Sequence, residues 1–132
     1  MATALVVSGY SEWQSKGALK TTWSSLSITT TGDVGTPENT YPGLNVMSVY
    51  VTGTMTSDAN LQFQESTAAS LTFAVGQTVC GTDLTFDSTT GTGLSTGVVY
   101  LVRPGAKVFR PKITAGASGS EDLTVIYTQV RT

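Results

Sequence analysis

The sequence contains no histidine and a single cysteine, Cys80. Without histidine, the chain can form neither a Ser-His-Asp nor a Cys-His catalytic group, and it lacks the commonest zinc ligand. One cysteine can form no intrachain disulfide and no Cys-x-x-Cys site, and here it has no His partner to activate its thiol. We therefore expect Cys80 to serve as a small hydrophobic residue, and we expect no catalytic residue, metal or cofactor.

Charged residues make up only 12% of the chain, and the net charge is -2. This balance gives no general affinity for phosphate backbones, so we expect no nucleic-acid partner. Long hydrophobic runs are also missing. The run at 4–7 is too short for the core of a signal peptide, and no stretch approaches the ~20 apolar residues of a membrane span. The sequence predicts a soluble protein that stays in the compartment where it is made and has no membrane partner.

The nine carboxylates show no pattern that selects a catalytic or metal-binding pair. Glu121 and Asp122 are adjacent before a predicted strand, and Asp83 and Asp87 flank a short apolar run, so all four fit solvated strand ends. The glycine-rich segment 91–97 is similar to a phosphate-binding loop, but it leads into an apolar strand and not into a helix. These observations favour a protein that is not an enzyme.

What the sequence does contain is β-forming. Thr and Ser supply over a quarter of the residues, and 14 glycines separate segments in which apolar and polar residues alternate. About eight strands are expected, including 19–30, 44–54, 60–65, 84–86, 98–103, 107–114 and 123–131. The chain is long enough for one self-sufficient core. We predict a single all-β domain over residues 18–132, an antiparallel β-sandwich or a jelly-roll-like barrel.

Residues 1–17 alternate poorly and carry Tyr10 and Trp13 within a polar stretch. We interpret this segment as an extended N-terminal arm. Two readings of the arm stay open: a frayed terminus, or an extension that reaches a neighbouring subunit with the two aromatic residues as anchors. The segment 98–102 is apolar on both faces, which predicts a central strand covered on both sides, one of them by another subunit.

Residues 103–112 hold four of the seven basic residues, whereas residues 21–102 contain none. If this segment is extended, Pro111 shares one face with Phe109, and Arg110 shares the other with Lys112. A proline inside a strand predicts an edge position, because it cannot donate to a neighbouring strand. The charged edge either prevents sheet-to-sheet aggregation or docks against an acidic protein surface. The interface candidates are Tyr10, Trp13, Arg103, Lys107, Arg110, Pro111 and Lys112.

The order of several short motifs resembles that of small virion proteins of tailed bacteriophages, a group similar to capsid decoration (cement) proteins with a compact β-sandwich. The motifs are Trp-Ser-Ser-Leu at 23–26, Gly-Asp-Val-Gly-Thr-Pro at 32–37, Val-Tyr-Val-Thr-Gly-Thr at 49–54, Phe-Arg-Pro-Lys-Ile-Thr-Ala-Gly at 109–116 and Asp-Leu-Thr-Val at 122–125. The resemblance spans residues 22–131 and leaves the arm outside. It departs at 65–69, where such relatives carry a Gly-Ser-Asn-Asp-Gly type of turn. It implies no catalytic residue, and Arg110 and Pro111 are the matched positions nominated for contacts.

The resemblance implies a structural protein on the outside of a phage head, made in the host cytoplasm, with the major capsid protein as its partner. A homo-oligomer is expected, with a closed trimer as the hypothesis, because repeated modest contacts strengthen binding through avidity. Two alternatives stay open. One is a carbohydrate-binding or host-adhesion module that uses exposed Trp or Tyr rings. The other is a tail or head-to-tail component with the same fold.

Overall fold

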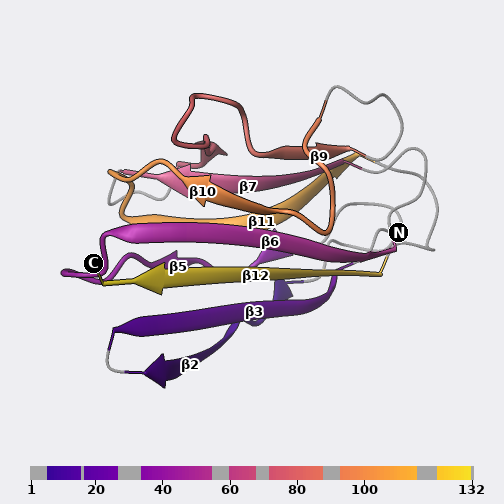
Figure 1. The fold of residues 1–132 in the computed structure, drawn as a ribbon. Coiled ribbons are helices and arrows are strands. Elements are labelled where there is room, and N and C mark those ends of the chain that lie inside the picture. Colours follow the sequence, from indigo (N-terminus) through magenta and orange to yellow (C-terminus); the bar gives the residue numbers. More distant parts are fainter. Residues whose placement is uncertain are drawn as a thin grey trace.

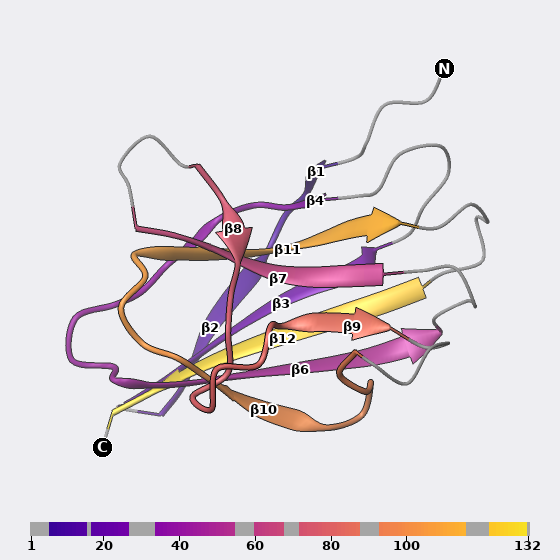
Figure 2. The same cartoon turned by 90° about the horizontal axis from the view of Figure 1, so that it is seen from above.

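The computed structural model describes residues 6–15, 17–26, 34–54, 60–67, 72–87, 93–115 and 122–131, and within these ranges it contains strands and no helix. The strands form two sheets that pack face to face (Figure 1). Figure 2 looks through one sheet onto the other and shows that their strands run at a shallow angle to one another, as in an aligned sandwich. The predicted all-β sandwich is confirmed.

The first sheet, called sheet B here, has five strands in the order β10-β6-β12-β3-β2, and every pair is antiparallel. Their bounds are Val99–Val102 (β10), Val46–Thr54 (β6), Asp122–Val130 (β12), Ala18–Leu26 (β3) and Tyr10–Ser15 (β2). Buried and half-buried residues alternate along β12 and most of β6. One face of sheet B therefore packs against the second sheet, and the described chain does not cover the other face.

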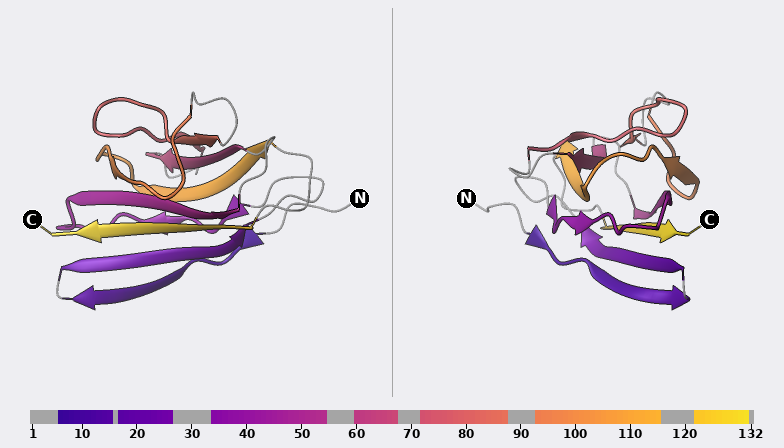
Figure 3. Two further views of the ribbon diagram at one scale, coloured as in Figure 1. Left: turned by 45° about the vertical axis from the view of Figure 1, so that its right-hand side comes forward. Right: turned by 90° about the vertical axis from the view of Figure 1, so that its left-hand side faces the viewer.

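The second sheet, sheet A, has seven strands built around β11 and β7. Its path runs through Val6–Val7 (β1), Val34–Gly35 (β4), Val108–Ala115 (β11), Asn60–Ser66 (β7) and Ala74–Val75 (β8), with Glu38–Asn39 (β5) also beside β11 and Thr85–Asp87 (β9) also beside β7. Strand β8 pairs antiparallel with β7. Figure 3 shows sheet A as a layer above β6, β12, β3 and β2.

Four aromatic side chains hold the two sheets together. Phe63 and Phe109 of sheet A stack with ring centroids 5.3 Å apart, and both lie 5.2 Å from the ring of Tyr127 in sheet B. Trp23 of sheet B meets Phe63 edge to face at 6.2 Å. All four are fully buried. Aromatic contacts of this kind add to the stabilisation that burial of apolar area already supplies.

The prediction that Pro111 marks an edge strand is wrong. Strand β11 lies inside sheet A, with β7 along one side and β4 and β5 along the other. Pro111 stands opposite Phe63, whose N–H and C=O both bond away from β11, to Leu84 and Gly76. The nitrogen of Pro111 therefore faces the break between β4 and β5, where no ladder hydrogen bond is required. An inner strand tolerates the proline because its neighbour is interrupted at that point.

The extended N-terminal arm is not confirmed. Residues 1–5 lie outside the described chain, but Val6–Val7 pairs with β4 and Tyr10–Ser15 pairs with β3. These pairings satisfy the N–H and C=O groups of a strand edge that would otherwise be open. Residues 10–14 are exposed on both faces of β2 because sheet A does not extend over this edge, which explains the poor alternation.

The prediction for 98–102 is also wrong, because β10 is the outermost strand of sheet B and is not a covered central strand. Val99 is 60% exposed and Leu101 is 48% exposed on its outer face. An apolar run shows that a strand carries no charged side chains. It does not show which other strand or sheet packs beside it. These two side chains enter the further inference below.

The aromatic cluster leads to a stability prediction. Phe63→Ala should lower the free energy of unfolding by about 3–5 kcal/mol, since it removes a fully buried ring that contacts both sheets. Val99→Ala, at an exposed position, should change it by less than about 0.5 kcal/mol. Urea unfolding followed by tryptophan fluorescence measures both. Similar losses in the two variants would contradict the assignment of the core.

A second prediction concerns pH. The Tyr127 hydroxyl is buried beside Thr40, and burial together with the Glu38 carboxylate raises the pKa of Tyr127 well above 10. Tyrosines of the unfolded chain ionise near pH 10, so the stability contributed by neutral Tyr127 is complete below that pH and is lost above it.

The free energy of unfolding should therefore fall by up to about 1.4 kcal/mol per pH unit above about pH 10. Tyr127→Phe should remove this contribution, whereas Tyr10→Phe, at an exposed ring, should leave it. Urea titrations at several pH values measure the slopes. Equal slopes in wild type and Tyr127→Phe would show that another group is responsible.

Candidate docking surfaces

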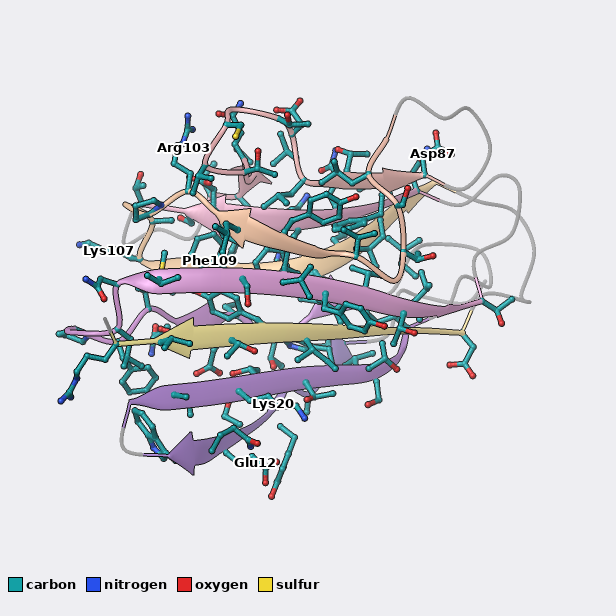
Figure 4. The ribbon with its side chains drawn as sticks, in the orientation of Figure 1. Glu12, Lys20, Asp87, Arg103, Lys107 and Phe109 are labelled. Carbon is teal, nitrogen blue, oxygen red and sulfur yellow. The ribbon has the colours of Figure 1, made fainter. Side chains whose placement is uncertain are left out.

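The seven interface candidates do not form one surface. Arg110 and Lys112 point out from the outer face of sheet A, as predicted from the alternation, while Pro111 between them is buried against the core. Arg103 and Lys107 lie in the connection from β10 to β11, and both are exposed. Figure 4 shows these two cations at the same end of the sandwich, pointing away from its body. Tyr10 and Trp13 lie on opposite faces of β2.

Arg110 is held in place by its neighbours. Its Nε donates to Gln64 Oε1 at 3.1 Å, and its guanidinium lies 3.9 Å from the centroid of the Phe73 ring. Partial burial lowers the pKa of Arg110 from its ordinary 12.5, but an arginine keeps its charge at neutral pH. Because its guanidinium already stacks on an aromatic ring and donates to an amide, Arg110 contributes more to the stability of sheet A than to binding a partner.

The motif residues behind the resemblance to phage proteins meet in space although they are distant in the sequence. A Cβ on Gly35 would lie 2.6 Å from Pro111 Cδ and 2.7 Å from Trp23 Cδ1, so only glycine fits there. Trp23 Nε1 donates to the carbonyl of Thr36 at 3.0 Å. Pro111 is therefore an architectural residue that closes sheet A against Trp23, and it is not available for a partner.

Trp13 forms an exposed aromatic pair with Tyr41. The two rings meet edge to face at 5.9 Å, with Trp13 57% and Tyr41 41% exposed. The loop that carries Tyr41 is anchored by the fully buried Gln129, whose Oε1 accepts from the Tyr41 N–H at 2.9 Å and whose Nε2 donates to the Asn39 carbonyl at 3.0 Å. Both rings are thus presented on rigid backbone.

Sequence reasoning missed Tyr41 as the partner of Trp13. The residue opens a Tyr-Pro-Gly turn, and nothing in the local pattern connects it with a strand almost thirty residues earlier. The sequence also did not predict that Gln129 is buried, since a glutamine within a strand is ordinarily exposed. Its burial follows from its position on the inner face of β12, where two backbone groups satisfy its amide.

The aromatic pair and Lys107 belong to the same end of the molecule. The N–H of Thr40, next to Tyr41, donates to the Lys107 carbonyl at 2.8 Å, and the Lys107 N–H donates to the Ser66 carbonyl at 2.9 Å. We use the name basic end for the surface made by Trp13, Tyr41, Arg103 and Lys107. It combines exposed rings with exposed cations on well-anchored backbone, a composition typical of contact surfaces.

A shallow groove of about 320 Å³ lies beside β10. Apolar side chains dominate its lining, among them Val79, Leu94 and Leu101. Cys80 also lines this groove and is exposed. The cysteine lies in a turn outside the sandwich core, where the N–H of Gly81 donates to the Thr78 carbonyl at 2.9 Å. A small apolar residue in a turn need not be buried, because turns run over the surface.

Asp83 and Asp87, which the sequence assigns to solvated strand ends, lie before and at the end of β9. Asp83 accepts a hydrogen bond from Gln77 Nε2 at 3.0 Å, and Asp87 ends β9. Among the described residues, no group of three His, Cys, Asp or Glu side chains is placed to hold a metal ion. Nor does this part of the chain contain a helix long and apolar enough to cross a membrane.

No protein-family model, curated protein or solved structure matches the chain. Residues of three of the short sequence motifs meet where Trp23, Gly35 and Pro111 pack together.

The contacts of Arg110 predict a structural role. Arg110→Ala should lower the free energy of unfolding by about 1–2 kcal/mol, through loss of the stacking on Phe73 and of the hydrogen bond to Gln64. Arg110→Lys should recover only part, because an ammonium lacks the planar fork. Arg103→Ala, at an exposed cation, is the control and should change stability by less than about 0.5 kcal/mol. An equal loss in Arg103→Ala would refute the distinction.

Proposed function

We propose that this protein is a non-enzymatic structural component of a phage virion, a decoration protein that binds the outside of the head and stabilises the shell. The observation that carries the proposal is the basic end, where Trp13 and Tyr41 are exposed next to Lys107 on anchored backbone. Exposed aromatic rings beside cations serve recognition of another surface, and they require no reacting group. The order of the sequence motifs agrees with this role.

The physical requirements of such a role are few. A decoration protein bridges neighbouring shell subunits and resists outward pressure, so it needs a stiff body and a contact surface. The four interlocked aromatic rings supply stiffness. In the proposal, Trp13 and Tyr41 supply contact area while Arg103 and Lys107 orient the protein on an acidic patch of the major capsid protein. Rim charges of this kind act mainly on orientation and association rate.

Binding to shells tests the proposal. Purified protein at micromolar concentration should co-sediment saturably with expanded shells that lack it, and added salt should weaken the binding as exposed charges are screened. Protein that stays in the supernatant at moderate salt would refute the proposal. Density for the protein in a tail or at the head-to-tail junction of an intact particle would assign it to the alternative virion component.

Matched variants locate the contact. Lys107→Glu and Trp13→Ala should each weaken shell binding by roughly tenfold. Lys112→Glu reverses the same kind of charge on the outer face of sheet A and should leave binding within about twofold. Thermal unfolding confirms that each variant is folded. If Lys112→Glu abolishes binding and Lys107→Glu does not, the docking surface is the outer face of sheet A.

The exposed Trp13 and Tyr41 rings also support a second candidate, a carbohydrate-binding or host-adhesion module, because sugar rings stack on aromatic faces. A glycan array separates the two functions. Binding that Trp13→Ala abolishes would favour the sugar module, and an array without signal would dismiss it.

A further inference from the structure

The outer face of sheet B is a broad surface that the described chain does not cover. Cross-strand registers place five side chains in one row across all of its strands. In the order of the strands from β2 to β10, the row is Tyr10, Thr22, Ile126, Tyr50 and Val99. Residues that stand directly opposite in antiparallel strands point to the same face, so the row forms one continuous band. Leu101 extends it along β10.

Charge is nearly missing from this face. In the described parts of its strands, the charged residues on the outer face are Glu12, Lys20 and Asp122. Glu12 and Lys20 face each other in register, and Figure 4 shows them side by side on β2 and β3. Asp122 lies at the far end of β12. Because Glu12 and Lys20 offset each other and Asp122 lies at the end of β12, the described part of this face carries little net charge that would repel an identical face.

The size of the face matches what a stable pair needs. Five strands of four to nine residues, spaced about 4.8 Å apart and rising about 3.4 Å per residue, span roughly 600 Å² in projection. Side chains corrugate the surface and raise its accessible area. Standard specific interfaces bury about 800 Å² on each partner, so the face is comparable with one side of such an interface.

We propose that the outer face of sheet B binds the same face of a second copy of this chain, giving a two-fold symmetric dimer. A second copy offers a sheet with the same twist, the condition under which two sheets pack in an aligned sandwich. In a two-fold symmetric dimer centred on Ile126, the row of one copy crosses the row of the other. The side chains of Tyr50 and Val99 then become buried in both copies.

This inference goes beyond the proposed function and does not depend on it, since dimer formation requires no shell. Protein that dimerises but fails to bind shells would overturn the proposed function alone. Protein that binds shells as a single chain would overturn the dimer alone.

Sedimentation equilibrium of the full chain tests the dimer. Wild type at about 100 µM should show twice the 13.8 kDa mass of one chain. Ile126→Lys places a charge at the centre of the face and should raise the dissociation constant at least tenfold. Val99→Lys should also weaken the dimer, and because Val99 is 60% exposed in the single chain this variant should fold normally.

Val75→Lys is the matched control. Val75 is a half-buried β-branched residue that stands opposite Gln64 on the outer face of sheet A, so its replacement should leave the dimer unchanged. A wild-type mass of one chain would overturn the inference, as would a trimer or any oligomer that Ile126→Lys and Val99→Lys leave intact. Equal weakening by Val75→Lys would also overturn it, since the effect would not be specific to sheet B.

Discussion

The packing of Trp23 between the two sheets is the contact on which the rest of the structure depends. The indole belongs to sheet B, yet it packs against Gly35 of sheet A, which in turn packs against Pro111. Glycine allows β4 to pass close to the ring, and the carbonyl of Thr36 accepts the indole N–H. Proline lets β11 continue past the break between β4 and β5 without an unpaired donor. Residues from three parts of the chain together close the sandwich.

The packing of the two sheets determines which outer surfaces and side chains remain accessible to a partner. Sheet A is covered in part on its outer face, because Phe73 lies over Arg110, and this arrangement turns a cation of the basic segment into a structural residue. No described segment covers the outer face of sheet B. The loops of the basic end are tied to sheet A through the Lys107 N–H, which donates to the Ser66 carbonyl, and to sheet B through the side chain of Gln129, which accepts from the Tyr41 N–H. Docking to a shell and pairing with a second copy thus involve different surfaces and can occur together.

Alternation predicted the strands well, because it reports directly which side chains avoid water. The outward direction of Arg110 and Lys112 was predicted for the same reason. The edge position of Pro111 was predicted wrongly, since it depends on which segments lie alongside β11. The pairing of Trp13 with Tyr41 could not be predicted, because a buried glutamine from β12 anchors the loop that presents Tyr41.

By itself, the sequence determined the β class of the fold and the positions of its longer strands, and it excluded the kinds of chemistry that need histidine or paired cysteines. It predicted about eight strands, whereas the described chain has twelve, because the additional strands are two or three residues long and depend on their neighbours. Only the tertiary structure decided which strands are edges, which cations are free to meet a partner and which face stays bare. The physical reason is that a strand's side-chain period is a local property, whereas its neighbours are selected by packing between residues far apart in the chain. The basic segment illustrates the difference, since one short run of sequence contributes to the core, to an outer sheet face and to an exposed end.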